Sequence, residues 1–243
     1  MPLFPPRVTA ILLFEPFRFK PLRYLAVTPL VLMLLFHVDF TLEANPRTAV
    51  PERLIEQARS EHGRRAMFRM ERWRDLMLDL DNKKDELELL EEVNDFFNAE
   101  IPFVDDIRHW KVIDYWATPY ESLGTNGGDC EDYVIAKFYS LLRLGIPPNK
   151  LRFNYVKALD YNQAHMVLTY YSSPGAMPLV LDNLTSRIRP ANERRDLKPV
   201  YSFNANGLWL DKAKGRSVAV GSSNSLDRWT DLRVRMARIG MSL

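Results

Sequence analysis

The stretch from Gly127 to Leu144, GGDCEDYVIAKFYSLLRL, is the part of the sequence that decides the fold. A glycine pair precedes Asp129, which is a favourable N-cap residue, and the acidic residues that follow suit the positive end of a helix dipole. Apolar residues then recur at helical spacing, and Gly145 with the prolines after it supplies a stop signal. The sequence therefore predicts a helix that begins at Asp129 and holds the Cys130 thiol inward in its first turn.

The sequence before this helix is charged and helix-forming. From Pro51 to about Asn98, apolar residues recur every three or four positions, which predicts two or three helices. Between Pro102 and Pro119 the aromatic residues follow no helical period, which indicates a structured loop, and a glycine-rich turn follows at Gly124 to Gly128.

After Asn149 the hydrophobic pattern changes to a period of two, which is typical of strands. Strands are predicted at residues 151–157, 164–171, 178–184, 200–203 and 208–210. The last two form a hairpin around Asn206 and Gly207, and an amphipathic helix is expected to start near Asn224 or Ser225. Helices followed by antiparallel strands predict an α+β fold.

Composition narrows the possible functions. With 243 residues and 47% hydrophobic content, the chain can bury the core of one ordinary domain. Its 33 lysines and arginines against 31 acidic residues give no footprint for nucleic acid or an acidic polymer. The single cysteine, Cys130, excludes an internal disulfide, so it is either core filling or a working thiol.

Residues 1–44 have the layout of an export segment. Basic residues as far as Arg23 precede an apolar run from Tyr24 to Phe36, and polar residues follow. The run is shorter than the roughly 20 residues that span a bilayer. Cleavage after Ala44 and retention as a membrane anchor are both open, and both predict export to the periplasm.

The predicted elements bring three chemically useful residues together. A helix N-terminus lowers the pKa of a thiol, and the thiolate is the nucleophilic form. His165 lies on a predicted strand after Cys130. If a four-residue loop, Ser172 to Gly175, which is one of several even lengths, joins this strand to the next, His165 lies directly opposite Asp182. Nucleophile, base and orienting acid are the arrangement that acyl transfer requires.

Three acidic residues flank the same thiol. Asp129, Glu131 and Asp132 would raise its pKa unless their charge is offset. They are either capping residues of the helix or ligands of a calcium ion, which favours clustered carboxylates and backbone carbonyls such as those of Gly127 and Gly128.

Four motifs carry a resemblance to a known family. They are Trp116–Leu123, Gly127–Asp132, Ala164–Val167 and Leu181–Asn183. With them the chain resembles the bacterial transglutaminase-like cysteine proteinases, most closely the LapG-type periplasmic proteases, from about Pro51 to near the C-terminus. The resemblance implies a papain/transglutaminase-like cysteine protease fold over residues 45–243. It would have an N-terminal helical lobe at about 50–120 and an antiparallel sheet in a catalytic core at about 121–243, with the nucleophile at a helix N-terminus.

The resemblance also implies the site and its partners. Cys130, His165 and Asp182 would form the catalytic triad, and Ca²⁺ would be bound through Asp129, Glu131 and Asp132. The substrate would be a large surface adhesin, cut near its N-terminus beside a pair of alanines so that the cell leaves a biofilm. An inner-membrane receptor that senses cyclic di-GMP would sequester the protease.

One residue departs from the family pattern, and two other functions remain open. Asn126 stands where a glycine is expected before the Gly127-Gly128 pair, which puts the calcium loop or the approach to the thiol in doubt. A transglutaminase or amidase would use the same triad but pass the acyl group to an amine. A non-catalytic calcium-binding module would only dock to a receptor.

Overall fold

The computed structural model describes residues 49–205, 207–212 and 216–243. These residues belong to one compact unit, Leu42–Leu243. The predicted export segment, residues 1–44, lies outside the described residues, so it stays a prediction. Within the described part of the chain, no helix is long and apolar enough to cross a membrane.

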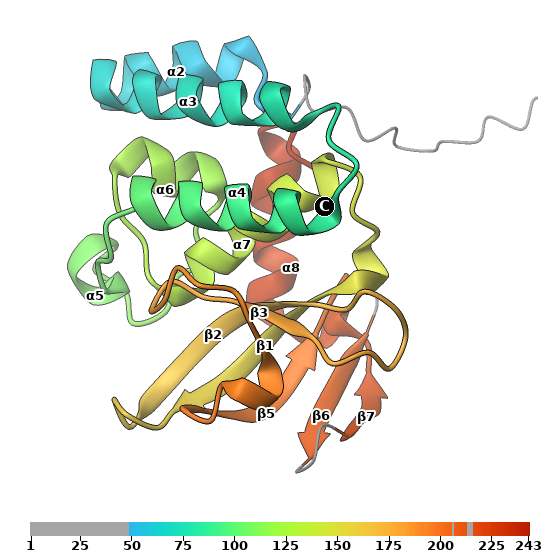
Figure 1. Cartoon of the computed structure of the whole chain (residues 1–243). Helices are drawn as coiled ribbons and strands as arrows, with labels where there is room; N and C mark the ends of the chain where they lie inside the picture. The colour runs from blue at the N-terminus through green and yellow to red at the C-terminus, as the bar shows by residue number, and fades with distance from the viewer. Residues whose placement is uncertain (1–48, 206, 213–215) are drawn as a thin grey trace, which may run out of the picture. The chain divides into compact units, whose positions relative to one another are not determined.

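Three long helices occupy the stretch in which two or three were predicted. They are α2 (Glu52–His62), α3 (Arg64–Leu80) and α4 (Glu86–Glu100). Helices α2 and α3 pack side by side, while α4 lies nearer the sheet (Figure 1). Their apolar stripes bury residues such as Leu54, Trp73 and Phe97 in one core.

Two short helices, α5 (Asp106–His109) and α6 (Pro119–Thr125), were not predicted. They lie where the sequence indicated an irregular loop and a glycine turn. Helix α6 forms because Thr118 and Glu121 make a capping box, in which each side chain accepts a hydrogen bond from the other residue's backbone N–H. Pro119 at the first helical position adds a preset φ angle.

Helix α7 (Cys130–Arg143) confirms the central prediction. It begins immediately after Asp129, whose N–H donates to Asp132 Oδ2 at 3.2 Å. Residues 131–141 are all buried, because the helix packs against α4 on one side and strand β2 (Gln163–Tyr170) on the other. A helix surrounded in this way holds its first turn rigidly.

One seven-stranded antiparallel sheet follows. Besides β2 it contains β1 (Leu151–Ala158), β3 (Leu179–Leu181), β4 (Arg189–Pro190), β5 (Leu197–Phe203), β6 (Leu208–Lys212) and β7 (Arg216–Gly221). The strand order is β4-β3-β2-β1-β5-β6-β7. The five predicted strands and the β5–β6 hairpin are confirmed, whereas β4 and β7 were not predicted. Helix α8 (Asp227–Arg238) is the predicted C-terminal helix.

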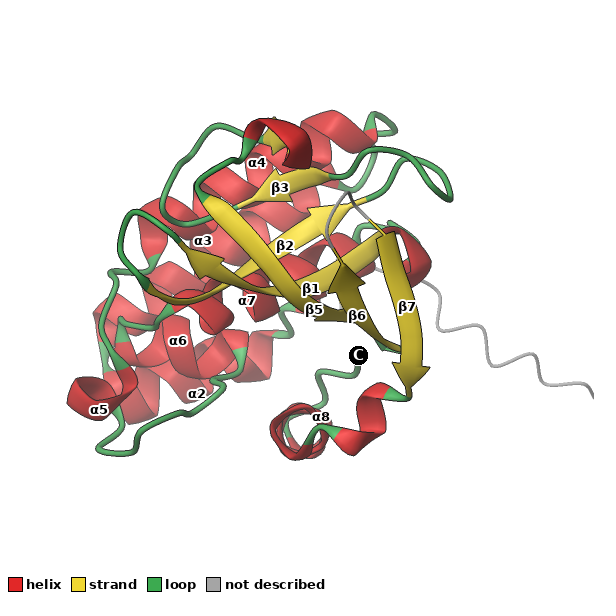
Figure 2. Cartoon of the chain, turned by 90° about the horizontal axis from the view of Figure 1, so that it is seen from below, coloured by secondary structure: helices red, strands yellow, loops and turns green. Residues whose placement is uncertain are grey.

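The two faces of the sheet are buried differently. Figure 2 shows helices α4 and α7 behind the sheet, and residues such as Phe153 and Leu168 join the main core. A small second cluster of Val156, Val167 and Val180 packs with Ala191 and Leu197. An antiparallel sheet covered in this way, together with the helices, confirms the α+β class.

The predicted register between β2 and β3 is wrong by two residues. Tyr170 pairs with Leu179, whereas the four-residue loop would have paired it with Met177. The connection is longer, from residue 171 to residue 178, because Pro178 has no N–H to donate to the ladder. Strand β3 ends at Leu181, so Asp182 lies just beyond the strand on which it was predicted.

Candidate active site

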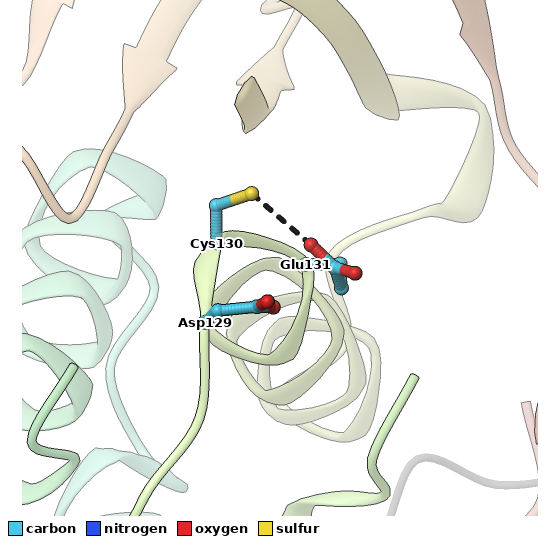
Figure 3. A group of neighbouring side chains, drawn as sticks. All are labelled: Asp129, Cys130 and Glu131. Carbon is cyan, nitrogen blue, oxygen red and sulfur yellow. Dashed lines mark hydrogen bonds between the residues drawn. The ribbon is translucent and has the colours of Figure 1, made fainter. Parts of the chain in front are cut away.

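Cys130 is the first residue of α7 and is half-buried. Its thiol donates a hydrogen bond to Glu131 Oε2 at 3.1 Å, as Figure 3 shows. The backbone N–H of Met166, the residue after His165, also lies close enough to the sulfur to lower its pKa. The start of α7 therefore meets β2 at the predicted nucleophile.

The charges around this thiol favour its protonated form. Burial raises the pKa of Cys130 well above its ordinary value, and the charges of Glu131 and Asp129 raise it further. These effects outweigh the helix N-terminus and the Met166 amide, which act in the opposite direction. The expectation that unscreened neighbouring carboxylates raise the thiol pKa is confirmed.

The predicted contact between His165 and Asp182 is present, although the register that suggested it is wrong. His165 Nε2 lies 2.7 Å from Asp182 Oδ1, and both residues are buried. A shift of two residues keeps a side chain on the same face of a sheet, so Asp182 becomes a diagonal neighbour within reach of the ring.

This contact also defines which ring nitrogen is available. The backbone N–H of Leu184 donates to the same Asp182 oxygen at 3.0 Å. An ionised carboxylate only accepts hydrogen bonds, so His165 Nε2 carries the proton and Nδ1 is the basic nitrogen. The acid therefore selects the tautomer in which Nδ1 can accept a proton.

Arg194 is a member of the site that the sequence did not reveal. Its Nη2 donates to Asp182 Oδ2 at 2.7 Å and to Asp196 Oδ2 at 2.7 Å, and its side chain is almost fully buried. Burial raises the pKa of Asp182, but the hydrogen bonds from His165, Leu184 and Arg194 outweigh this and lower it to about 2. The acid is thus ionised at any physiological pH.

The three acids predicted beside the thiol belong to a larger carboxylate cluster. Asp106 and Asp114 join Asp129, Glu131 and Asp132 in overlapping groups whose ligand atoms lie within 4.8 Å of one another. Asp106 begins α5, and Asp114 lies in the aromatic loop before α6. These two residues were missed, although they lie in the aromatic stretch that was predicted to be a structured loop, and acidic residues in such a loop were the available signal.

The cluster fits a hard cation. Oδ1 atoms of Asp106, Asp114 and Asp129 are buried and make no hydrogen bond among the described residues. Burial, followed by repulsion from neighbouring acids, raises the pKa of Asp129, and burial likewise raises that of Glu131. Clustered carboxylate oxygens that lack other partners, and whose mutual repulsion a cation would offset, are the kind of ligand set that calcium takes.

Asp132 also serves as a structural residue. It is fully buried, and its Oδ1 accepts from the backbone N–H of Ala117 at 2.7 Å while Oδ2 accepts from that of Asp129. The acids were predicted to be either capping residues or calcium ligands, and different residues fit the two roles. Asp132 caps α7 and ties it to the loop before α6, whereas Asp129 has an oxygen to spare.

Asn126 shows why a glycine was expected at its position. Its backbone is left-handed, with φ of 63° and ψ of 53°, where it ends α6. Asparagine tolerates this conformation better than most residues with a side chain. The departure from the family pattern thus keeps the turn that leads to Gly127 and Gly128.

Helix α8, near the C-terminus, contacts the loop that precedes α6. Arg235 Nη1 donates to Glu121 Oε2 at 2.7 Å, and its Nη2 donates to the carbonyl of Trp116. The guanidinium also lies 4.5 Å above the ring of Tyr115, whose backbone N–H donates to Asp106 Oδ2. The C-terminal helix is therefore connected to the carboxylate cluster through this loop.

Known proteins resemble this chain in sequence and in fold. A profile of the bacterial transglutaminase-like cysteine proteinases (BTLCP) matches residues 70–203. Solved structures of LapG from Legionella pneumophila are 43% identical over 76% of this chain. The match to an EGTA-treated form has a TM-score of 0.66 and covers 96% of that chain. The match to a calcium-bound form has a TM-score of 0.65 and covers 98% of that chain. No curated protein matches the chain.

Proposed function

Because the chain belongs to the bacterial transglutaminase-like cysteine proteinases and is a cysteine protease, we propose that it is a calcium-dependent endopeptidase that uses Cys130, His165 and Asp182. The observation that carries this proposal is the 2.7 Å hydrogen bond between Asp182 Oδ1 and Nε2 of His165, which lies on β2, the strand that meets α7. It supplies an oriented base on the residue before Met166, whose N–H lies close to the thiol of Cys130.

The proposed reaction follows the general logic of acyl transfer. His165 Nδ1 accepts the thiol proton, and Cys130 Sγ attacks the peptide carbonyl to give an acyl-enzyme. The imidazolium then protonates the leaving amine, while ionised Asp182 stabilises its charge. Water hydrolyses the acyl-enzyme with His165 again as the base. The N–H of Cys130 at the helix start is a candidate oxyanion donor.

Calcium dependence is proposed from the site and from the relatives. LapG of Legionella pneumophila was solved in calcium-bound and EGTA-treated forms, and the cluster described above fits calcium. Asp106, Asp129 and Glu131 would hold the ion, with Asp114 and Asp132 at its edge. When bound, calcium supplies positive charge beside the thiol. Glu131 and Asp129, engaged in this way, would no longer oppose ionisation of Cys130.

The resemblance supports a specific biological setting. We propose that the protein is exported to the periplasm and cuts a large surface adhesin near its N-terminus, beside a pair of alanines, which releases the adhesin and disperses a biofilm. An inner-membrane receptor for cyclic di-GMP would sequester the protease when the second messenger is abundant.

The test uses the organism's own large adhesin. Its periplasmic portion is incubated with the protein in calcium and in EGTA, and the products are sequenced from their N-termini. One cut in calcium that is absent in EGTA and with Cys130→Ala is expected. Cleavage by Cys130→Ala would remove the thiol from the mechanism.

The same assay separates the nearest alternative. A transglutaminase or amidase would pass the acyl group to an added labelled amine, so labelled adducts instead of a new N-terminus would favour that function. Cleavage that is indifferent to EGTA would return the acids to a purely capping role.

A further inference from the structure

A lysine is buried in the core beside the proposed triad. Lys137, on α7, is 1% exposed, and its Nζ donates to Asn98 Oδ1 at 2.7 Å and to Asn94 Oδ1 at 2.9 Å. The two asparagines lie one turn apart on α4. The ammonium is thus held by two amide oxygens from the neighbouring helix, over the ring of Tyr133 at 5.7 Å.

The amide nitrogens of both asparagines donate to the segment that begins with Asp182, the proposed catalytic acid. Asn98 Nδ2 donates to the backbone carbonyl of Asp182 at 2.9 Å, and Asn94 Nδ2 donates to that of Ser186 at 2.9 Å. The protonated ammonium only donates, so it fixes each amide with its oxygen toward Nζ and its nitrogen toward the carbonyl. Lys137 therefore sets the orientation of both donors.

The backbone of this segment needs such support. Strand β3 ends at Leu181, so no ladder hydrogen bond of that strand reaches Asp182, and the chain stays irregular until β4 begins at Arg189. The side chain of Asp182 is fixed by His165 and Arg194, but its main chain is held by Asn98 of α4. Helix α7 thus carries both the thiol and the lysine that orients this tether.

Stability alone gives a weak reason for a lysine at this place. Burial lowers the pKa of Lys137 to about 7, against the opposing charges of Asp182 and Asp95. Replacing a buried charge by an apolar residue of similar volume is often neutral or stabilising, so the ammonium is an expensive way to fill the core. Its cost is understandable if the orientation of Asn98 matters to the reaction.

We propose that Lys137 and Asn98 are positioning residues that hold the main chain of Asp182 so that its carboxylate stays in contact with His165. This inference rests on the proposed function, because it assigns the tether to the same triad. Asn94 shares the ammonium but anchors the segment four residues further on, at Ser186.

The two asparagines provide a matched pair of variants. Asn98→Asp keeps an oxygen for Lys137 but loses the donor to Asp182, and Asn94→Asp makes the same change at Ser186. Small displacements of a catalytic group cost large factors in rate. We expect Asn98→Asp to lower kcat about 10-fold or more, with KM and the half-maximal calcium concentration within about two-fold. Asn94→Asp should stay within about two-fold in kcat.

A second variant and a second measurement keep the test decisive. Asn98→Ser removes both contacts without adding a buried charge, and it should show the same loss of kcat if Asn98→Asp does not fold. Hydrogen exchange of the Leu184 N–H, which donates to Asp182 Oδ1, should accelerate in the Asn98 variants and in Lys137→Met.

The hydrogen-exchange arm needs no substrate, so it judges the tether even if the wild-type protein cleaves no adhesin. Equal kcat values for the Asn98 and Asn94 variants, or unchanged exchange at Leu184, would overturn the inference. A wild-type protein without peptidase activity would instead overturn the proposed function.

Discussion

Arg194 and His165 bind opposite oxygens of the Asp182 carboxylate. Arg194 Nη2 lies 2.7 Å from Oδ2, and His165 Nε2 lies 2.7 Å from Oδ1. All three side chains are buried, so these hydrogen bonds replace the water that an exposed carboxylate would have. The arginine thus adds to the effect of His165 on the ionisation of the acid and holds the oxygen that faces away from the imidazole.

Removal of this arginine is expected to harm stability and activity together. Arg194→Met leaves a buried carboxylate oxygen without its donor, which should cost about 3 kcal/mol in the free energy of unfolding and lower kcat about 10-fold. Urea denaturation and peptidase kinetics measure the two effects. Arg195→Met, at the adjacent exposed position, is the control and should stay within about 0.5 kcal/mol.

The same variant should shift the acid limb of stability. The pKa of Asp182 is lowered to about 2 in the folded protein, so its contribution is present above its ordinary pKa of 3.8 and is lost as pH falls through 2. Without Arg194 the folded pKa rises, so the contribution of Asp182 is smaller and its loss is complete at a higher pH. Identical acid denaturation of the two proteins would contradict this role.

Asp106 is expected to be a calcium ligand. Asp106→Asn can still accept from the N–H of Tyr115 but replaces the unpartnered Oδ1 with an amide nitrogen. The calcium concentration for half-maximal activity should rise about 10-fold, since a ligating carboxylate contributes charge as well as an oxygen. Asp105→Asn, at the exposed neighbouring position, should leave it within about two-fold. Equal calcium titrations would remove Asp106 from the site.

The left-handed backbone at Asn126 predicts an order of tolerance. Asn126→Gly should change the free energy of unfolding by less than about 0.5 kcal/mol, because glycine adopts this conformation freely. Asn126→Ala should cost about 1 kcal/mol, since its Cβ crowds the following carbonyl. Denaturation curves of the two variants test this order. A more stable alanine variant would show that the turn has another conformation in solution.

Lys137 should make stability depend on pH in the alkaline range. Its folded pKa of about 7 lies below the ordinary 10.5, so between these values the unfolded chain binds more protons and stability rises with pH. The slope is at most about 1.4 kcal/mol per pH unit. Lys137→Met should lack this rise in stability with pH. Urea denaturation of both proteins at a series of pH values measures the difference. Parallel curves would contradict a buried, titrating lysine.

Helix α7, which carries the Cys130 thiol, and the His165–Asp182 contact could both be predicted from the sequence, but the physical grounds differ. Capping residues and an apolar stripe are local signals, so the start of α7 could be placed to the residue. The strand contact depended on a loop length that the sequence left open. It was predicted correctly because every even loop length keeps His165 and Asp182 on the same face of the sheet.

The residues that were missed reach the site from irregular segments. Arg194 follows a short 3-10 helix, and Asp114 lies in a loop, so neither belongs to a periodic pattern that could have placed it. Asp106 lies in a helix of four residues, too short to be recognised by period. Such contacts depend on how the chain folds back on itself, which neither propensity nor spacing specifies.

The similarity to the protease family spans residues 70–203, yet α8 begins only at Asp227. The ring centroid of Trp229 lies 5.2 Å from that of Phe153 and 5.6 Å from that of Phe203. Arg235 binds the loop between Asp106 and Asp132 through its hydrogen bonds. A protein truncated after residue 203 would therefore lose α8, which would expose the core residues that Trp229 covers and remove the support of the calcium site. The smallest piece of this chain able to act as an enzyme must extend through its final helix.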